Sequence, residues 1–178
     1  MGKIIYSLVE YMLAARQAKL PAEVVQKGKS HTLDSLAAIV SGSRLKPGQL
    51  GLQHAREQGG KEECSVLGSN LKTTPIAAAF ANGMSGHADE TDDSNSQLHP
   101  GCAIIPAALA MAESQNSNGE ALLRAVILGY DIGFRFHQAF EPRSTSFGAT
   151  FGASTAAGAL AELNSLQLCY LILSLIHI

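Results

Sequence analysis

The chain has few cysteines, few aromatic residues and no tryptophan. Its three cysteines, Cys64, Cys102 and Cys169, are far apart and form no Cys-x-x-Cys pair. This argues against a disulfide framework or a zinc knuckle and favours a reducing compartment. Aromatic side chains make up 6% of the residues, so stacking on bases or sugars is not an expected binding mode. The abundant alanine and glycine are instead typical of closely packed helices.

Neither a strong charge nor a membrane-spanning segment is present. The chain carries 13 basic and 15 acidic residues, for a formal net charge of -2 at pH 7. It has no long run of Lys or Arg of the kind that binds nucleic acid. Glu10 and Arg16 interrupt the apolar pattern at the start, unlike a signal peptide or a membrane anchor. We therefore expect a soluble, cytoplasmic protein that binds neither nucleic acid nor membrane.

Apolar residues recur at helical spacing, and no segment shows the period of two that is typical of a strand. At 178 residues the chain suits one domain, or the front part of a larger protein. The predicted fold class is therefore all-α. We also expect Pro106 to lie near the start of its helix. We expect a brief extended segment at residues 64–67, a short helix after Pro47, and helices over residues 5–20, 21–40, 75–87, 102–113, 120–137 and 147–163.

The same spacing predicts the buried faces of two helices, each made of large apolar side chains. In the helix over residues 21–40 the predicted face consists of Val24, Val25, Leu33, Leu36, Ala37 and Val40. In the helix over residues 120–137 it consists of Leu122, Leu123, Val126, Ile127 and Tyr130.

The last residues differ in composition from the rest. Residues 168–178 are nearly all apolar yet too few to span a bilayer, which takes about 20 residues. A domain rarely ends on an exposed patch of this kind, because such a patch aggregates or demands a partner. We therefore divide the chain into a helical domain over residues 1–164 and an apolar tail over residues 165–178 whose sequence is partly non-native.

The loop over residues 86–101 concentrates the residues that carry chemistry. It contains two histidines and four acidic residues between two apolar segments, and acids and imidazoles held together can shift one another's pKa values. Asp89 and His99 lie at its two edges, so a loop that folds back would bring both to one small substrate for proton transfer. The alternative is a solvated acidic loop that caps helices.

A metal site is a rival interpretation of this loop. Carboxylates and imidazoles are suitable ligands, but their spacing matches neither the helical His-x-x-x-His pair of zinc enzymes nor a calcium loop. We therefore predict no metal site. The ligands considered are His87, Asp89, Asp92, Asp93 and His99.

Basic residues outside the loop are candidates for binding substrate carboxylates. Lys72, Arg135 and Arg143 could do so, a guanidinium through two parallel hydrogen bonds. His137 ends a predicted helix, where the helix dipole favours its cation. Each of these residues could equally serve a structural role.

Several motifs occur in order along most of the chain. They are Leu33-Asp34-Ser35-Leu36, Ser41-Gly42, Ala78-Ala79-Phe80-Ala81-Asn82-Gly83, His87-Ala88-Asp89, Asp92-Asp93, His99-Pro100-Gly101, Pro106-Ala107, Gly129-Tyr130-Asp131 and residues 147–157. Together these motifs resemble the MmgE/PrpD family, which includes 2-methylcitrate dehydratase, cis-aconitate decarboxylase and iminodisuccinate epimerase.

The resemblance implies a helical domain that a smaller α/β domain, missing here, completes farther along the chain. It implies an N-terminal fragment of a homodimer that needs no metal or organic cofactor. It also places Asp89 and His99 in the active site, with the family's threonine falling on Asp93 by counting or on Ser94 by residue type. A further family histidine lies near His137, with the register offset by one residue.

These observations lead to one main hypothesis, a cofactor-independent lyase of small polycarboxylates that dehydrates 2-methylcitrate or a relative. Decarboxylation of cis-aconitate or epimerisation of iminodisuccinate would reuse the same proton-transfer groups. A helical module that binds a partner without catalysis and a metal hydrolase are the other hypotheses. The predicted catalytic residues are Asp89, His99, Asp93 and Ser94, and the predicted substrate-binding residues are His87, Asp92, Lys72, Arg135 and His137.

Overall fold

The structure, a computed structural model, describes residues 2–95, 97–140 and 146–175. Across them it is all-α, as predicted, apart from two antiparallel strands of two residues each. The elements are α1 (Lys3–Gln17), α2 (Ala22–Gly42), α3 (Lys46–Gln58), β1 (Cys64–Ser65), β2 (Lys72–Thr73), α4 (Pro75–Gly86), α5 (Gly101–Ser114), α6 (Gly119–Ala139), α7 (Phe147–Leu160) and α8 (Ser165–Leu175).

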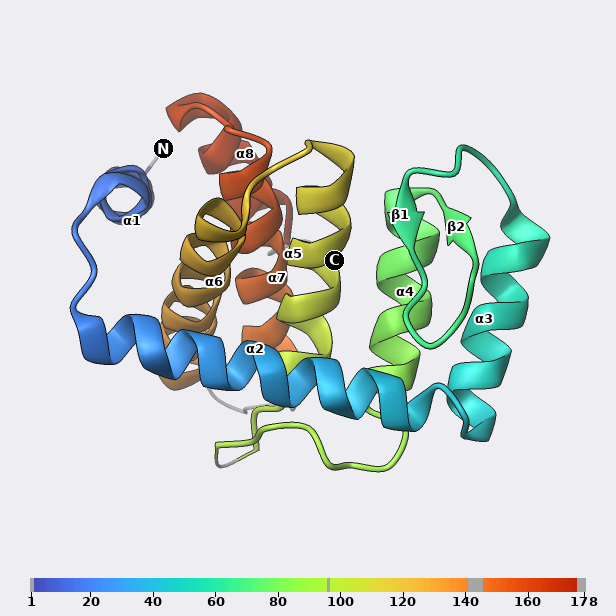
Figure 1. Cartoon of the computed structure of the whole chain (residues 1–178). Helices are drawn as coiled ribbons and strands as arrows, with labels where there is room; N and C mark the ends of the chain where they lie inside the picture. The colour runs from blue at the N-terminus through green and yellow to red at the C-terminus, as the bar shows by residue number, and fades with distance from the viewer. Residues whose placement is uncertain (1, 96, 141–145, 176–178) are drawn as a thin grey trace.

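The long helix α2 lies across α4, α5 and α6 (Figure 1). The helices α1 and α8 lie at one side of the molecule, and α3, α4 and the β1–β2 ribbon at the other. Asn82, which is fully buried in α4, donates to the Ser65 carbonyl at 3.0 Å and accepts from the Leu67 N–H at 2.9 Å. These bonds attach α4 to the ribbon. They therefore fix the helix from which the loop over residues 87–100, called the site loop below, begins.

Three clusters of buried side chains fill the spaces between the helices. The first joins α1, α6, α7 and α8 around Val9, Ile132 and Phe151. The second joins α5, α6 and α7 around Ile104, and the third lies under the ribbon around Ala78. The third cluster contains residues of both α4 and α5, and the second holds α5 against α6 and α7, so both helices that flank the loop over residues 87–100 are fixed by apolar packing.

The contact between α6 and α7 is made through small residues. Gly129 and Gly133 of α6 face Gly148 and Gly152 of α7, so the two backbones approach closely. A Cβ atom on Gly152 would lie 2.6 Å from the carbonyl oxygen of Gly129 and 2.7 Å from Cδ1 of Ile104. Side chains larger than hydrogen at these positions would push the helices apart.

The predicted apolar face of α2 was wrong in part: Val24, Val25 and Leu36 are half-buried and Leu36 packs on the second cluster, but Leu33, Ala37 and Val40 are exposed. Leu33 is 70% exposed and Val40 is 48% exposed, whereas the buried residues of this helix are Gly28, Ser35, Ala38, Ile39 and Gly42. Four of these five buried residues are small, because a helix that crosses others at short range makes most of the contact through small side chains; Ile39 is the large one. In α6 only Val126 of the predicted face is fully buried, and Ala125, Leu128, Gly129, Ile132, Gly133 and His137 are buried with it.

The structure also shows where Pro106 and the apolar tail lie. Pro106 lies inside α5, five residues after its start, rather than in the first turn. The apolar tail forms α8, which buries Leu168, Cys169 and Ile172 against its neighbours; residues 176–178 lie outside the described ranges. Among the described helices, none combines the length and the apolarity needed to cross a bilayer.

The close approach of α6 and α7 predicts the effect of Gly152→Ala. The added methyl group would overpack the contact, and we expect a loss of about 1–3 kcal/mol in the free energy of unfolding, measured by urea denaturation. Gly119→Ala is the matched control, because nothing lies within 4 Å of a Cβ at that position. It should stabilise the helix by at most about 1 kcal/mol. Equal effects of the two variants would contradict the close contact.

Candidate functional site

The candidate site is built on the loop that joins α4 to α5. His87 is the C-terminal cap of α4, and Pro100 directly precedes α5. Within the loop, Asn95 and Leu98 exchange backbone hydrogen bonds of 3.0 and 3.1 Å, and the Leu98 side chain is fully buried. This short turn folds the loop back, so that residues from both of its edges come together.

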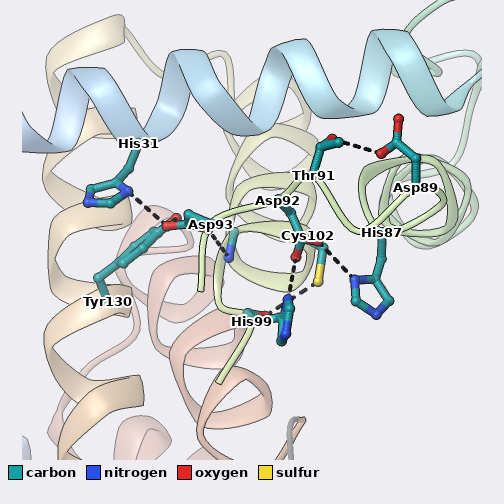
Figure 2. Close-up of polar contacts among 10 residues, drawn as sticks. His31, His87, Asp89, Thr91, Asp92, Asp93, His99, Cys102 and Tyr130 are labelled. Atoms are coloured by element: carbon teal, nitrogen blue, oxygen red, sulfur yellow. Dashed lines mark hydrogen bonds and ion pairs between the residues drawn. The ribbon is translucent and has the colours of Figure 1, made fainter. Parts of the chain in front are cut away.

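Asp92 lies between two imidazoles (Figure 2). Its Oδ1 is 2.9 Å from Nδ1 of His87, and its Oδ2 is 3.4 Å from Nδ1 of His99. The second contact is within ion-pair distance but is not aligned as a hydrogen bond, and both of its atoms are buried. The Asp92 side chain is 0% exposed, His99 is 25% exposed and His87 is 47% exposed, so a buried anion supports two imidazoles that solvent reaches.

Asp93, the next residue, serves the opposite side of the loop. Its Oδ2 accepts from the Tyr130 hydroxyl at 2.9 Å and lies 2.8 Å from Nδ1 of His31. Its Oδ1 accepts from the N–H of Gly101 at 3.0 Å. Burial raises the pKa of the Asp93 carboxyl, while the hydrogen bond from Tyr130 opposes that rise. Asp93 therefore links the loop to α2, α5 and α6.

Asp89 is held on the outer part of the loop. Its carboxylate accepts from Thr91 at 2.7 Å and from Ser41 of α2 at 3.1 Å. These hydrogen bonds, that of Thr91 foremost, lower its pKa. Between Asp89 and Thr91, Glu90 adopts the left-handed backbone conformation with φ of 54°, a strained state for a residue other than glycine. The aspartate beside His99 is thus Asp92 rather than the Asp89 that the spacing predicted, and a catalytic role for Asp89 stays a prediction.

The remaining predicted residues lie apart from this cluster or have local partners. Ser94 is exposed in the loop, and Lys72 is exposed on β2. Arg135 pairs with Asp131 at 2.9 Å, and its guanidinium lies 5.0 Å from the centre of the Tyr11 ring. His137 is buried against α7 near Gly148, and neither ring nitrogen has a hydrogen-bond partner in the part of the chain that the structure describes. Arg143 lies outside the described residues.

Cys102, in the first turn of α5, adjoins the same cluster. Its thiol donates to the His99 carbonyl at 3.4 Å. Burial, followed by the negative charge of Asp92, raises the pKa of this thiol to about 12. At neutral pH Cys102 is therefore a neutral, weakly reactive thiol and no nucleophile.

The sequence did not single out His31 as a site residue. It lies on α2 one turn before Ser35, and Gly28, Ser35 and Gly42 recur at helical spacing on the buried face of that helix. Reading α2 by its small residues instead of its large ones would have placed His31 toward the site. Tyr130, expected only as a core residue, lies beside it with ring centroids 5.3 Å apart.

A family model of the MmgE/PrpD N-terminal domain matches residues 6–172. The chain belongs to this family. The assignment agrees with the all-α fold and with the order of motifs in the sequence, and the match extends into α8.

Curated relatives of this MmgE/PrpD chain include three proteins named for cis-aconitate decarboxylation. The cis-aconitate decarboxylase-like protein oryM of Aspergillus oryzae is 29% identical, over 93% of this chain and 37% of its own length. The cis-aconitate decarboxylase of Aspergillus terreus is 29% identical, over 80% and 31%, and that of Homo sapiens is 28% identical, over 82% and 33%. The chain spans about a third of the length of these relatives.

The bonds of Asp93 predict the effect of Tyr130→Phe. Removing the hydroxyl leaves the largely buried carboxylate of Asp93 short of one donor, so we expect a loss of about 1–3 kcal/mol in the free energy of unfolding at neutral pH. Tyr11→Phe is the matched control: its hydroxyl also donates to an aspartate, Asp131, but at an exposed position, where we expect at most about 0.5 kcal/mol.

The loss caused by Tyr130→Phe should also depend on pH. Because the pKa of Asp93 is raised in the folded state, the folded chain holds this proton to higher pH than the unfolded chain does. Protonation therefore favours folding, and this contribution disappears as the pH rises through the folded pKa. The lost bond is strongest to the ionised form, so the penalty should shrink as the pH falls through that pKa. If urea denaturation gave the same loss of unfolding free energy for Tyr130→Phe at every pH, this role of the Tyr130 hydroxyl would be contradicted.

The position of Cys102 predicts its reactivity toward a disulfide reagent such as DTNB at pH 8. Cys102 of the native chain should react slowly, because burial and the nearby Asp92 raise the pKa of its thiol and keep it protonated. Asp92→Asn removes the nearby charge, lowers the pKa of Cys102 and should speed the reaction severalfold. Asp89→Asn is the control and should leave the rate unchanged. Equal rates for the Asp92→Asn variant and the parent chain would show that Asp92 does not act on the thiol.

Proposed function

We propose that the chain carries the proton-transfer groups of a cofactor-independent lyase that acts on small polycarboxylates. The observation that carries this proposal is the buried carboxylate of Asp92 between the imidazoles of His87 and His99, at 2.9 and 3.4 Å. A carboxylate in contact with an imidazole orients the ring and stabilises its cation. His99 and His87 would exchange protons with the substrate, and Asp92 would position them.

Decarboxylation of a cis-aconitate-like acid is the reaction we put first, because the relatives named above are cis-aconitate decarboxylases. In this reaction the bond between the saturated carbon and its carboxylate breaks, and carbon dioxide leaves. The released electron pair forms a new carbon–carbon double bond. The former double bond shifts its electron pair to the distant carbon, which takes a proton from an imidazolium. One protonated histidine thus suffices as the acid.

Dehydration of 2-methylcitrate or a related hydroxy acid, which the sequence placed first, is the second candidate. It needs a base for the proton next to a carboxylate and an acid for the departing hydroxyl group. The two imidazoles around Asp92 offer both functions, and their rings lie edge to face with centroids 5.1 Å apart. Both candidate reactions would therefore use the same side chains in different protonation states.

The substrate carboxylates need cationic partners, and two of the predicted ones, Arg135 and Lys72, lie on other elements of the structure. Arg135 is paired with Asp131, and Lys72 lies on the β1–β2 ribbon. Because the chain spans about a third of its relatives, we propose that further cationic groups come from a longer, homodimeric protein in the cytoplasm. Imidazolium ions of His87 and His99 would contribute part of the positive charge here.

The test is proton NMR of cis-aconitate, citrate and 2-methylcitrate incubated with the 178-residue chain. In parallel, the complete product of its gene is assayed wherever that extends farther. We expect loss of one acid with new alkene signals. Asp92→Asn and His99→Gln should each lower kcat/KM by about 100-fold or more, while His54→Gln, which alters a histidine packed on Phe80 of α4, should leave it unchanged. If none of the three acids is consumed, the proposal is wrong.

A further inference from the structure

We propose that His87, Asp92 and His99 also form a binding site for one zinc-like divalent cation. The donor set is two imidazole nitrogens and one carboxylate, which is the set that zinc takes from proteins when it keeps a fourth position open. All three residues belong to the loop between α4 and α5, and Figure 2 shows both imidazoles beside the carboxylate of Asp92.

The donor atoms are already close to the spacing that zinc requires. One ligand atom from each residue lies within 4.8 Å of the other two, and the two histidine–carboxylate distances are 2.9 and 3.4 Å. Ligands at about 2.1 Å from a tetrahedral ion lie about 3.4 Å from one another. The widest pair would have to close by about 1.4 Å at most, which a rotation of the half-exposed His87 ring can supply.

A second observation points to a ligand at this place. Oδ2 of Asp92 and Nδ1 of His99 are both buried, and neither has a hydrogen-bond partner in the described part of the chain. Buried polar atoms are normally satisfied, and leaving them without partners costs free energy. A cation bound by both atoms would remove that cost. The 0% exposed Asp92 would anchor the ion, and the 47% exposed His87 would admit it.

The donor chemistry also predicts which ions bind. Calcium and magnesium prefer sites made of oxygen, with six or more ligands, and two imidazoles are poor substitutes. Zinc and its neighbours in the transition series accept imidazole readily. The sequence alone did not predict this set, because separations of five and seven residues match no helical metal motif and become a site only when the loop folds back.

Binding of the ion would block the reaction proposed above, since it occupies the nitrogen and oxygen atoms that would move or support the proton. This inhibition rests on the proposed function. The binding itself does not, because it depends only on the three side chains and can be measured without any substrate.

Isothermal titration calorimetry of the 178-residue chain with zinc chloride tests the site. We expect one ion per chain, with no comparable binding of magnesium. His87→Gln and His99→Gln should each weaken binding at least tenfold. His54→Gln, on α3, and Cys102→Ser, which removes the thiol beside His99, should leave the dissociation constant unchanged. Circular dichroism establishes whether each variant is folded. If a variant at a more buried position does not fold, His87→Gln still tests the site, because His87 is half-exposed.

Two results would overturn the proposal: absence of saturable zinc binding, or binding that His87→Gln leaves as tight as in the parent chain. A turnover assay with and without zinc separates this proposal from the proposed function. One-to-one binding without turnover of any tested acid would support the metal site and contradict the lyase. Turnover of an acid without zinc binding would support the lyase and contradict the metal site.

Discussion

A carboxylate that is largely withdrawn from solvent must be supplied with donors, and Asp93, 12% exposed, obtains them from three separate helices. The contacts come from His31 of α2, the N–H of Gly101 at the start of α5, and Tyr130 of α6. If any one helix moved away, a charged group would be left in a poorly solvated place. Asp93 therefore fixes the site loop to three helices at once, with the bond from Ser41 of α2 to Asp89 as a further contact, and the arrangement of Asp92 and its imidazoles depends on this position.

The frame around this anchor is built for close contact rather than for large apolar side chains. Gly101 allows α5 to begin directly against Asp93 and Ser35, and the glycines between α6 and α7 bring those helices together in the same way. Backbones that touch leave little room for adjustment, because neither side chain can change rotamer to relieve a shift. The candidate catalytic groups are consequently carried on a loop with rigid ends, which suits groups that must be held at fixed distances.

The sequence predicted the fold class, the main helices and the loop that carries the site. These features follow from the 3.6-residue spacing of apolar side chains and from turn residues, which are local properties of the chain. It failed where tertiary contacts decide. Leu33 and Val40 form an apolar stripe that is exposed, since α2 is buried by its small residues instead. His99 lies beside Asp92 rather than Asp89 because the loop turns at Glu90 and because Asp93 is bound by residues of α2 and α6. The spacing of residues in the sequence predicts neither of these contacts.

Asp92 and Asp93 are neighbours whose carboxylates serve opposite sides of the loop, one the imidazoles and the other the bundle. Because the two carboxylates diverge from adjacent positions, the group that would support the imidazoles and the group that fixes the loop share one backbone segment. A movement of Asp93 away from α2 and α6 would therefore be passed directly to Asp92 and to both histidine contacts. Docking of the loop on the bundle and ordering of the site are in this sense one structural event.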